Sequence, residues 1–269
     1  MSGRVAGLSS GQPRTRWAPS IAVVAAFLVL LLAPPVRSAV PSPARSTGTP
    51  PASRPSLVKT LSVEVLRRWK PVGGEPETLS AHVYYSSTGA TVIDVRRPAR
   101  QIIQLADEHQ RILYPETGQA FDFIWGSKQF LPFIQNLTQA MDNDNGMSAA
   151  GFTLEGSRAA GDSLISWWNP PLPVRGTVGQ TRLATVRGRL AWVEIQDAKG
   201  RIMIQRSCTG TLQAGPFKLP ARIRTEIHRG ATPGVEVVDY SMAEVNRPLP
   251  PWVTTFQLPR GAAIRDLRR

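Results

Sequence analysis

The stretch DVRRPARQIIQLADEHQRILYPETGQAFDF, residues 94–123, reads as a series of short β-strands separated by turns. Apolar residues alternate with polar ones along it, which is the period of a strand with one buried face. Pro98, the polar run 107–109 and the sequence Pro-Glu-Thr-Gly at 115–118 interrupt the alternation, and each is typical of a turn. The stretch therefore predicts an antiparallel meander with one apolar face.

The same two-residue period extends in both directions from this stretch. Upstream it includes Leu61, Val63 and Val65, and downstream it resumes in residues 152–155, 164–168, 190–195, 202–206, 221–228 and 235–245. Between these two sets, residues 127–141 follow a helical period, with Ser127 as the expected N-cap. The fold class predicted from the pattern is mostly β with helices (α+β), built from two antiparallel meanders.

The N-terminus has the pattern of an export signal. Arg4, Arg14 and Arg16 precede an apolar run at 21–33, and no acidic residue comes before that run. As a helix, the run would span roughly 20 Å, short of the roughly 30 Å hydrocarbon core of a bilayer. We expect residues 1–38 to be a signal peptide, with retention as an anchor as the alternative. Residues 39–56 form a Pro- and Ser-rich linker, and residues 57–269 form one folded domain.

The charge and cysteine content narrow the class of partner. The formal net charge is +13, and the balance stays positive without the four arginines of the first 39 residues. Such a charge suits anionic lipid headgroups or nucleic acid. No basic motif with interleaved aromatic residues is present, and export favours the lipid, so no nucleic-acid partner is expected. The single cysteine, Cys208, rules out an intrachain disulfide and N-terminal lipid attachment, so the exported chain is expected to be soluble.

None of the residues that could carry chemistry forms a catalytic pattern. The three histidines, His82, His109 and His228, lie in distant segments without metal-ligand spacing. The run 142–146 resembles a calcium loop, but its glycine comes one position early and Thr153 stands where such a loop needs Glu. We therefore expect a binding protein rather than an enzyme, with no metal and no cofactor.

Three segments are similar to the LolA-like family of periplasmic outer-membrane lipoprotein carriers. The first is VIDVRRPARQIIQLADEHQRILYPETGQAF at 92–121, followed by the expected helix with Phe133. The second is LPARI at 219–223, and the third is TFQLPRGAAIRDLRR at 255–269. The family typically carries Arg-Pro where this chain has Ser87-Thr88, and Trp in place of Ile93. The arginine used in cargo hand-off thus has no counterpart there.

The resemblance implies a strongly curved antiparallel sheet, an incomplete barrel, covered by short helices that enclose an apolar cavity for acyl chains. We place the lid at Phe130, Phe133 and Ile134. The strand alternation then places the cavity floor at the apolar positions Val83, Tyr85, Ile93, Val95, Ile103 and Leu105. The alternative, that all nine are ordinary core residues, fits the pattern as well as a role in binding does.

The function predicted from these observations is that of a periplasmic carrier, which binds acyl chains of lipoproteins or other lipids for transfer between membranes. By resemblance, its partners would be an acylated lipoprotein or lipid, an inner-membrane donor and an outer-membrane acceptor, with the carrier itself a monomer. The alternative is a lipid-sensing or regulatory domain of the same fold that acts on a membrane partner. Retention of the N-terminal signal as an anchor would favour that alternative.

Overall fold

The structure, a computed structural model, describes residues 58–87, 89–125, 137, 144, 146–148, 150–228 and 233–267. The expected signal peptide and linker lie outside the described residues. So do most residues of the helix predicted at 127–141, including the three expected lid residues, Phe130, Phe133 and Ile134.

The first half of the described chain forms the predicted antiparallel meander. Its strands are β1 (Thr60–Lys70), β2 (Glu77–Ser86), β3 (Thr91–Arg97), β4 (Gln101–Ala106), β5 (His109–Tyr114) and β6 (Gln119–Ile124). Each pairs with the next along the chain. All six strands expected from the alternation between residues 61 and 123 are thus confirmed, and the tight turns lie where Gly, Pro and Asp break the pattern.

The second half forms another meander, with elements that the sequence did not reveal. Its strands are β7 (Thr153–Ala160), β8 (Ser163–Asn169), β9 (Val178–Val186), β10 (Arg189–Asp197), β11 (Ile202–Thr209), β14 (Arg222–Ile227) and β15 (Gly234–Val245). A hairpin, β12 (Leu212–Ala214) and β13 (Phe217–Leu219), connects β11 to β14, and β16 (Ala263–Asp266) ends the described chain. The strand β9, the hairpin and β16 were not predicted.

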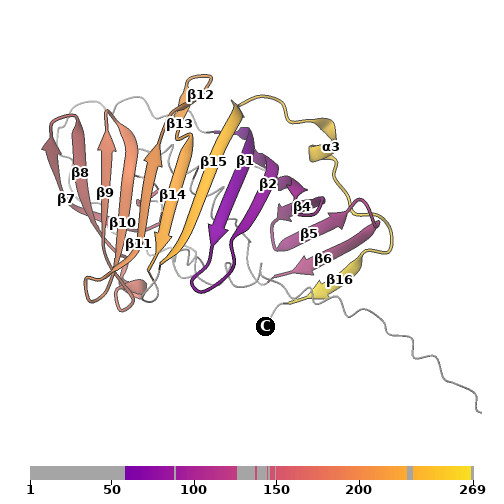
Figure 1. Ribbon diagram of the computed structural model, residues 1–269, viewed down its shortest axis with the longest axis horizontal. Helices are drawn as coiled ribbons and strands as arrows, with labels where there is room; N and C mark the ends of the chain where they lie inside the picture. Colours follow the sequence, from indigo (N-terminus) through magenta and orange to yellow (C-terminus); the bar gives the residue numbers. More distant parts are fainter. Residues whose placement is uncertain are drawn as a thin grey trace, which may run out of the picture.

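The two meanders join into one sheet of 14 strands, in the order β16-β6-β5-β4-β3-β2-β1-β15-β14-β11-β10-β9-β8-β7. The junction is the long antiparallel ladder between β1 and β15, which brings residues 61–70 beside residues 235–245. At one edge, β16 pairs in parallel with β6. The sheet is curved and does not close into a barrel, because β7 and β16 remain at opposite ends of the strand order (Figure 1).

Helices are few in the described part of the chain, which corrects the expectation of a sheet covered by short helices. Besides Leu137, which is helical, they comprise the 3-10 turn η2 (Leu172–Val174) and the four-residue α3 (Pro251–Thr254). The hairpin β12–β13 instead packs against the apolar residues of the central sheet. The physical reason lies in its sequence, because Pro216 and Pro220 bracket β13 and would interrupt a helix there.

Two apolar clusters form the core. The larger one, which we call the apolar face, is centred on Leu61, Val63 and Val65 of β1 and extends over β2 to β5, β14, β15 and the hairpin. The smaller one lies over β8, β9 and β10 and contains Trp168, Leu183 and other buried residues. No helix among the described residues is long and apolar enough to span a bilayer.

Candidate functional site

The six residues predicted as a cavity floor come together in the structure. They lie on β2, β3 and β4, where Val83 is opposite Ile93 and Ile93 is opposite Ile103 in the strand register. Five of them are buried in the apolar face, and Tyr85 packs against it half-buried. The strand alternation thus places all six on one side of the sheet; their role in binding an acyl chain stays a prediction.

The expected lid is represented by a single described residue, Leu137. Its side chain is only 1% exposed and belongs to the same apolar face as Val83 and Ile93. Leu137 is one turn beyond Phe133 and Ile134 in a helical period. The segment that contains the expected lid therefore contacts the apolar face at this position.

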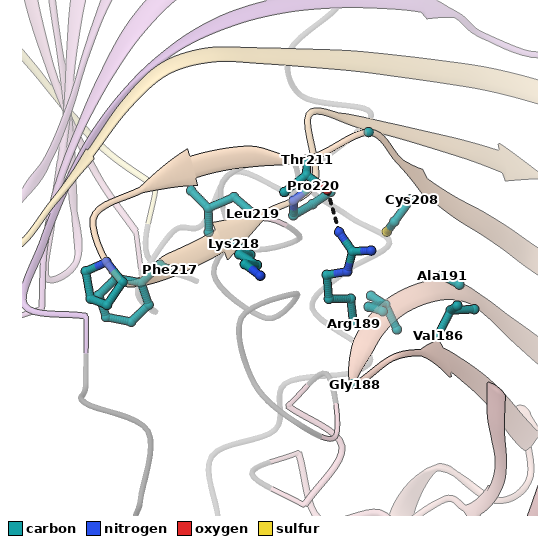
Figure 2. Close-up of a pocket in the computed structure, with 13 residues that line it drawn as sticks. Val186, Gly188, Arg189, Ala191, Cys208, Thr211, Phe217, Lys218, Leu219 and Pro220 are labelled. Atoms are coloured by element: carbon teal, nitrogen blue, oxygen red, sulfur yellow. Dashed lines mark hydrogen bonds between the residues drawn. The ribbon is translucent and has the colours of Figure 1, made fainter. Parts of the chain in front are cut away.

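A pocket of about 500 Å³ lies between the hairpin and the ends of strands β10 and β11 (Figure 2). This volume falls within the range typical of small-molecule sites, roughly 300–1,000 Å³. The turn between β9 and β10 completes its wall. The lining residues are Val186, Gly188, Arg189, Leu190, Ala191, Cys208, Gly210, Thr211, Pro216, Phe217, Lys218, Leu219 and Pro220.

The hairpin forms one wall of the pocket because its own apolar residues are anchored on the sheet. Leu219 and Ala214 are 1% and 2% exposed and belong to the apolar face, and Phe217 packs against it. On the facing wall, Leu190 of β10 packs against the smaller cluster. The pocket therefore lies between the two apolar clusters, and apolar side chains line both of its walls.

Two cations lie at this pocket. The Arg189 guanidinium donates a hydrogen bond to the Thr211 hydroxyl oxygen over 2.5 Å, which ties the β9–β10 turn to the start of the hairpin (Figure 2). Arg189 and Lys218 are both exposed, so each cation is available to a ligand headgroup or to solvent. The pocket thus combines apolar side chains such as Leu190 and Phe217 with polar groups and two cations.

The only cysteine reports on the environment of the pocket wall. Burial raises the pKa of the Cys208 thiol to about 11, although the nearby Arg206 guanidinium acts in the opposite direction. Desolvation therefore outweighs the favourable charge of the arginine at this position. The thiol behaves as a small apolar group in the wall and remains protonated at neutral pH.

None of the pocket residues was among the nine predicted site residues. Leu190 and Ala191 were recognised as part of an alternating strand, and Leu219 as part of LPARI, but no pattern linked these segments to one another. The available signal was the pair of prolines around Phe217, Lys218 and Leu219, which indicates a short turn structure. Among the described residues, no group of three or more His, Cys, Asp or Glu side chains could hold a metal ion.

No known family model matches the chain, and no curated protein matches it. It is similar to a DUF1329 family protein from Desulfovibrio piger, at 12% identity and a TM-score of 0.50, over 75% of this chain and 91% of the other. A LolA superfamily protein from Nitrosomonas europaea matches at 18% identity and a TM-score of 0.47, over 73% and 90%. A putative outer membrane lipoprotein-sorting protein domain from Vibrio parahaemolyticus matches at 10% and 0.45, over 73% and 89%. The likeness to the Desulfovibrio piger protein concerns the fold.

Proposed function

We propose that this protein is a periplasmic carrier that binds the acyl chains of lipoproteins or other lipids and transfers them between membranes. The observation that carries the proposal is the pocket of about 500 Å³, in which apolar side chains from the sheet and from the hairpin lie beside polar groups and two cations. The sequence resemblance to lipoprotein carriers supports the same class of cargo. We propose binding, rather than catalysis, as the activity of this site.

The energetics of cargo transfer set two requirements for the site of a carrier. Moving one methylene from water to an apolar site gains about 0.8 kcal/mol, so a sixteen-carbon chain represents on the order of 12 kcal/mol. A carrier must compensate most of this to extract its cargo and must later release it. An apolar, preformed pocket with a movable cover satisfies both requirements.

In this proposal the binding site extends from the pocket along the apolar face. Val83, Ile93 and Ile103 would contribute to its floor, and Phe130, Phe133 and Ile134 would be the movable cover. Leu137 supports this placement because it is buried against the same face.

The proposed location follows from the N-terminal pattern. Residues 1–38 would be removed on export, which would leave a soluble monomer between an inner-membrane donor and an outer-membrane acceptor. Intact-mass measurement on fractionated cells tests this: the expected chain begins near Ala39 and is found in the periplasmic fraction. Full-length protein in the inner membrane would contradict the soluble carrier and favour an anchored sensor.

Binding is tested by titrating the purified protein with a fluorescent fatty acyl probe and displacing the probe with a lipopeptide. Ala191→Phe places a large side chain in the pocket wall, so we expect it to weaken binding at least tenfold. Ala160→Phe, on the exposed strand β7, is the matched control and should bind as the wild type does. Phe133→Asp should weaken binding with little change in melting temperature if Phe133 covers the site.

Failure of the wild-type protein to bind any acyl probe would refute the proposal. Equal loss of binding and of folded structure in Phe133→Asp would show instead that Phe133 is an ordinary core residue, because burying a carboxylate in a packed core costs several kcal/mol. The unfolding transition, followed by circular dichroism, separates these two results.

A further inference from the structure

A row of four residues, of which Thr225 and Glu236 are buried and Arg206 and Trp69 are half-buried, crosses four neighbouring strands on the same side of the sheet as the apolar face. Arg206 on β11 is opposite Thr225 on β14, Thr225 is opposite Glu236 on β15, and Glu236 is opposite Trp69 on β1. Thr225 is 5% exposed and Glu236 is 7% exposed. Buried charges are normally paired, so each member of this row requires a partner.

A second guanidinium, that of Arg67, lies beside the row, two residues before Trp69 on β1, so one carboxylate faces two guanidiniums. The Arg67 Nε atom lies 2.6 Å from Glu236 Oε1, and the Arg67 guanidinium also lies 5.8 Å from the centre of the Trp69 ring. This ion pair occupies the carboxylate. The cluster of Arg67, Glu236 and Arg206 therefore keeps one positive charge that no described acidic group neutralises by direct contact.

That charge belongs to Arg206. Its Nε atom is sealed from solvent and has no hydrogen-bond partner, and no ion pair joins its side chain to another described residue. Burial is the main cause that lowers the pKa of the guanidinium, which Glu236 only partly offsets. Beside it, the Thr225 hydroxyl is also buried without a hydrogen-bond partner. Two buried donor atoms that lack a hydrogen-bond partner, Arg206 Nε and Thr225 Oγ1, thus lie on adjacent strands.

Of these two donors, Arg206 is close to the pocket. Arg206 and Cys208 lie on the same side of β11, two residues apart, which corresponds to about 6.6 Å along a strand. Cys208 lines the pocket, and its thiol and the Arg206 guanidinium interact electrostatically. A ligand whose chain occupies the pocket could therefore present a polar end to Arg206 without leaving the apolar face.

We propose that Arg206 and Thr225 bind the anionic group of an acyl ligand, so that the protein selects acyl chains that carry a carboxylate or a phosphate over neutral ones. The inference rests on the proposed function, because it assumes that an acyl chain occupies the pocket. The arginine would pair with the anion, and the threonine hydroxyl would donate a second hydrogen bond. Charge-assisted hydrogen bonds of this kind are about twice as strong as neutral ones.

The test compares ligands that share one chain and differ in the head. The full chain, as exported, is loaded with a neutral fluorescent acyl probe, and the probe is displaced by hexadecanoic acid, hexadecyl phosphate or hexadecanol. We expect one or both acids to bind at least tenfold more tightly than the alcohol. Inorganic phosphate should not displace the probe, and its doing so would assign the site to a free anion instead.

Variants then assign the preference to the side chains. Arg206→Met should abolish the preference for the acids and keep the affinity for hexadecanol, whereas Arg206→Lys should retain part of the preference. Thr225→Val, which removes only the hydroxyl, should reduce it. Arg224→Met removes a guanidinium from the opposite side of β14 and is the matched control, expected to behave as the wild type does.

The outcomes separate this inference from the proposed function. Equal affinity of the wild type for the acids and the alcohol refutes anion selection but leaves acyl binding intact, and it decides the question even if Arg206→Met does not fold. An undiminished preference in a folded Arg206→Met protein also refutes it. Failure of all three ligands to displace the probe, or of the probe to bind, overturns the proposed function and the inference with it.

Discussion

The rate at which alkylating reagents modify the Cys208 thiol measures how strongly this part of the pocket wall is desolvated. Alkylating reagents attack the thiolate, so the reaction rate follows the fraction of cysteine that is ionised. Burial raises the pKa of this thiol from the ordinary value of 9.0 to about 11. At pH 8 the ionised fraction is then about 1 in 1,000 in the folded protein and about 1 in 11 in the unfolded chain. We expect iodoacetamide to react about 90-fold more slowly with the folded protein.

The assay follows alkylation by mass spectrometry from pH 7 to 11, with urea-unfolded protein as the reference. The folded rate should rise about tenfold per pH unit over most of this range, because so little of the thiol is ionised. Bound acyl ligand should slow the reaction further, since Cys208 lines the pocket. A folded rate that levels off near pH 9, or equals the unfolded rate at pH 8, would refute the description of Cys208 as a desolvated wall residue.

The same shift predicts how stability depends on pH. Below about pH 8 the thiol is almost fully protonated in both states, so it has little effect on the free energy of unfolding. Between pH 9 and 11 the unfolded chain ionises first, and stability falls with rising pH by up to about 2.7 kcal/mol. Cys208→Ala lacks this contribution, and the difference between the two proteins across that range isolates it from the effect of other groups.

Three further substitutions test the packing around the site. Glu236→Gln leaves the Arg67 guanidinium without its buried carboxylate, so we expect the free energy of unfolding to fall by about 3–5 kcal/mol in urea titrations. Leu219→Ala should cost about 2–5 kcal/mol because this side chain anchors the hairpin at 1% exposure, whereas Leu164→Ala, at 46% exposure, should cost under about 0.5 kcal/mol. Gly179→Ala should lower the melting temperature, because a Cβ there would lie 2.2 Å from a carbonyl oxygen of β10. Wild-type stability in Glu236→Gln, Leu219→Ala or Gly179→Ala would contradict the packing described for that residue.

The strands around the apolar face were predictable from sequence because apolar residues recur there at every second position. Leu61, Val63 and Val65 alternate with polar residues, and in the structure they face the core while their neighbours do not. The turn residues then defined the ends of the strands. Local alternation and turn chemistry were therefore sufficient for the first meander.

The pocket could not be predicted in the same way, since it depends on contacts between distant segments. The hairpin strands have three residues each, which is too short for a periodic signal. In β9, Thr181 and Thr185 share a side with Leu183, so the apolar side of this strand looks polar in sequence. The partners of Arg67 and Arg206 are defined by pairing between β1, β15, β14 and β11, which no local pattern encodes.

The most direct measurement of the central claim is photo-crosslinking with a fatty acid that carries a photoreactive group along its chain. If an acyl chain occupies the pocket, mass spectrometry should find crosslinks on β10, β11 and the hairpin, near Leu190, Cys208 and Phe217. An excess of unlabelled fatty acid should abolish them. Crosslinks that are absent, that resist competition, or that fall only on the opposite side of the sheet would contradict acyl binding at this site.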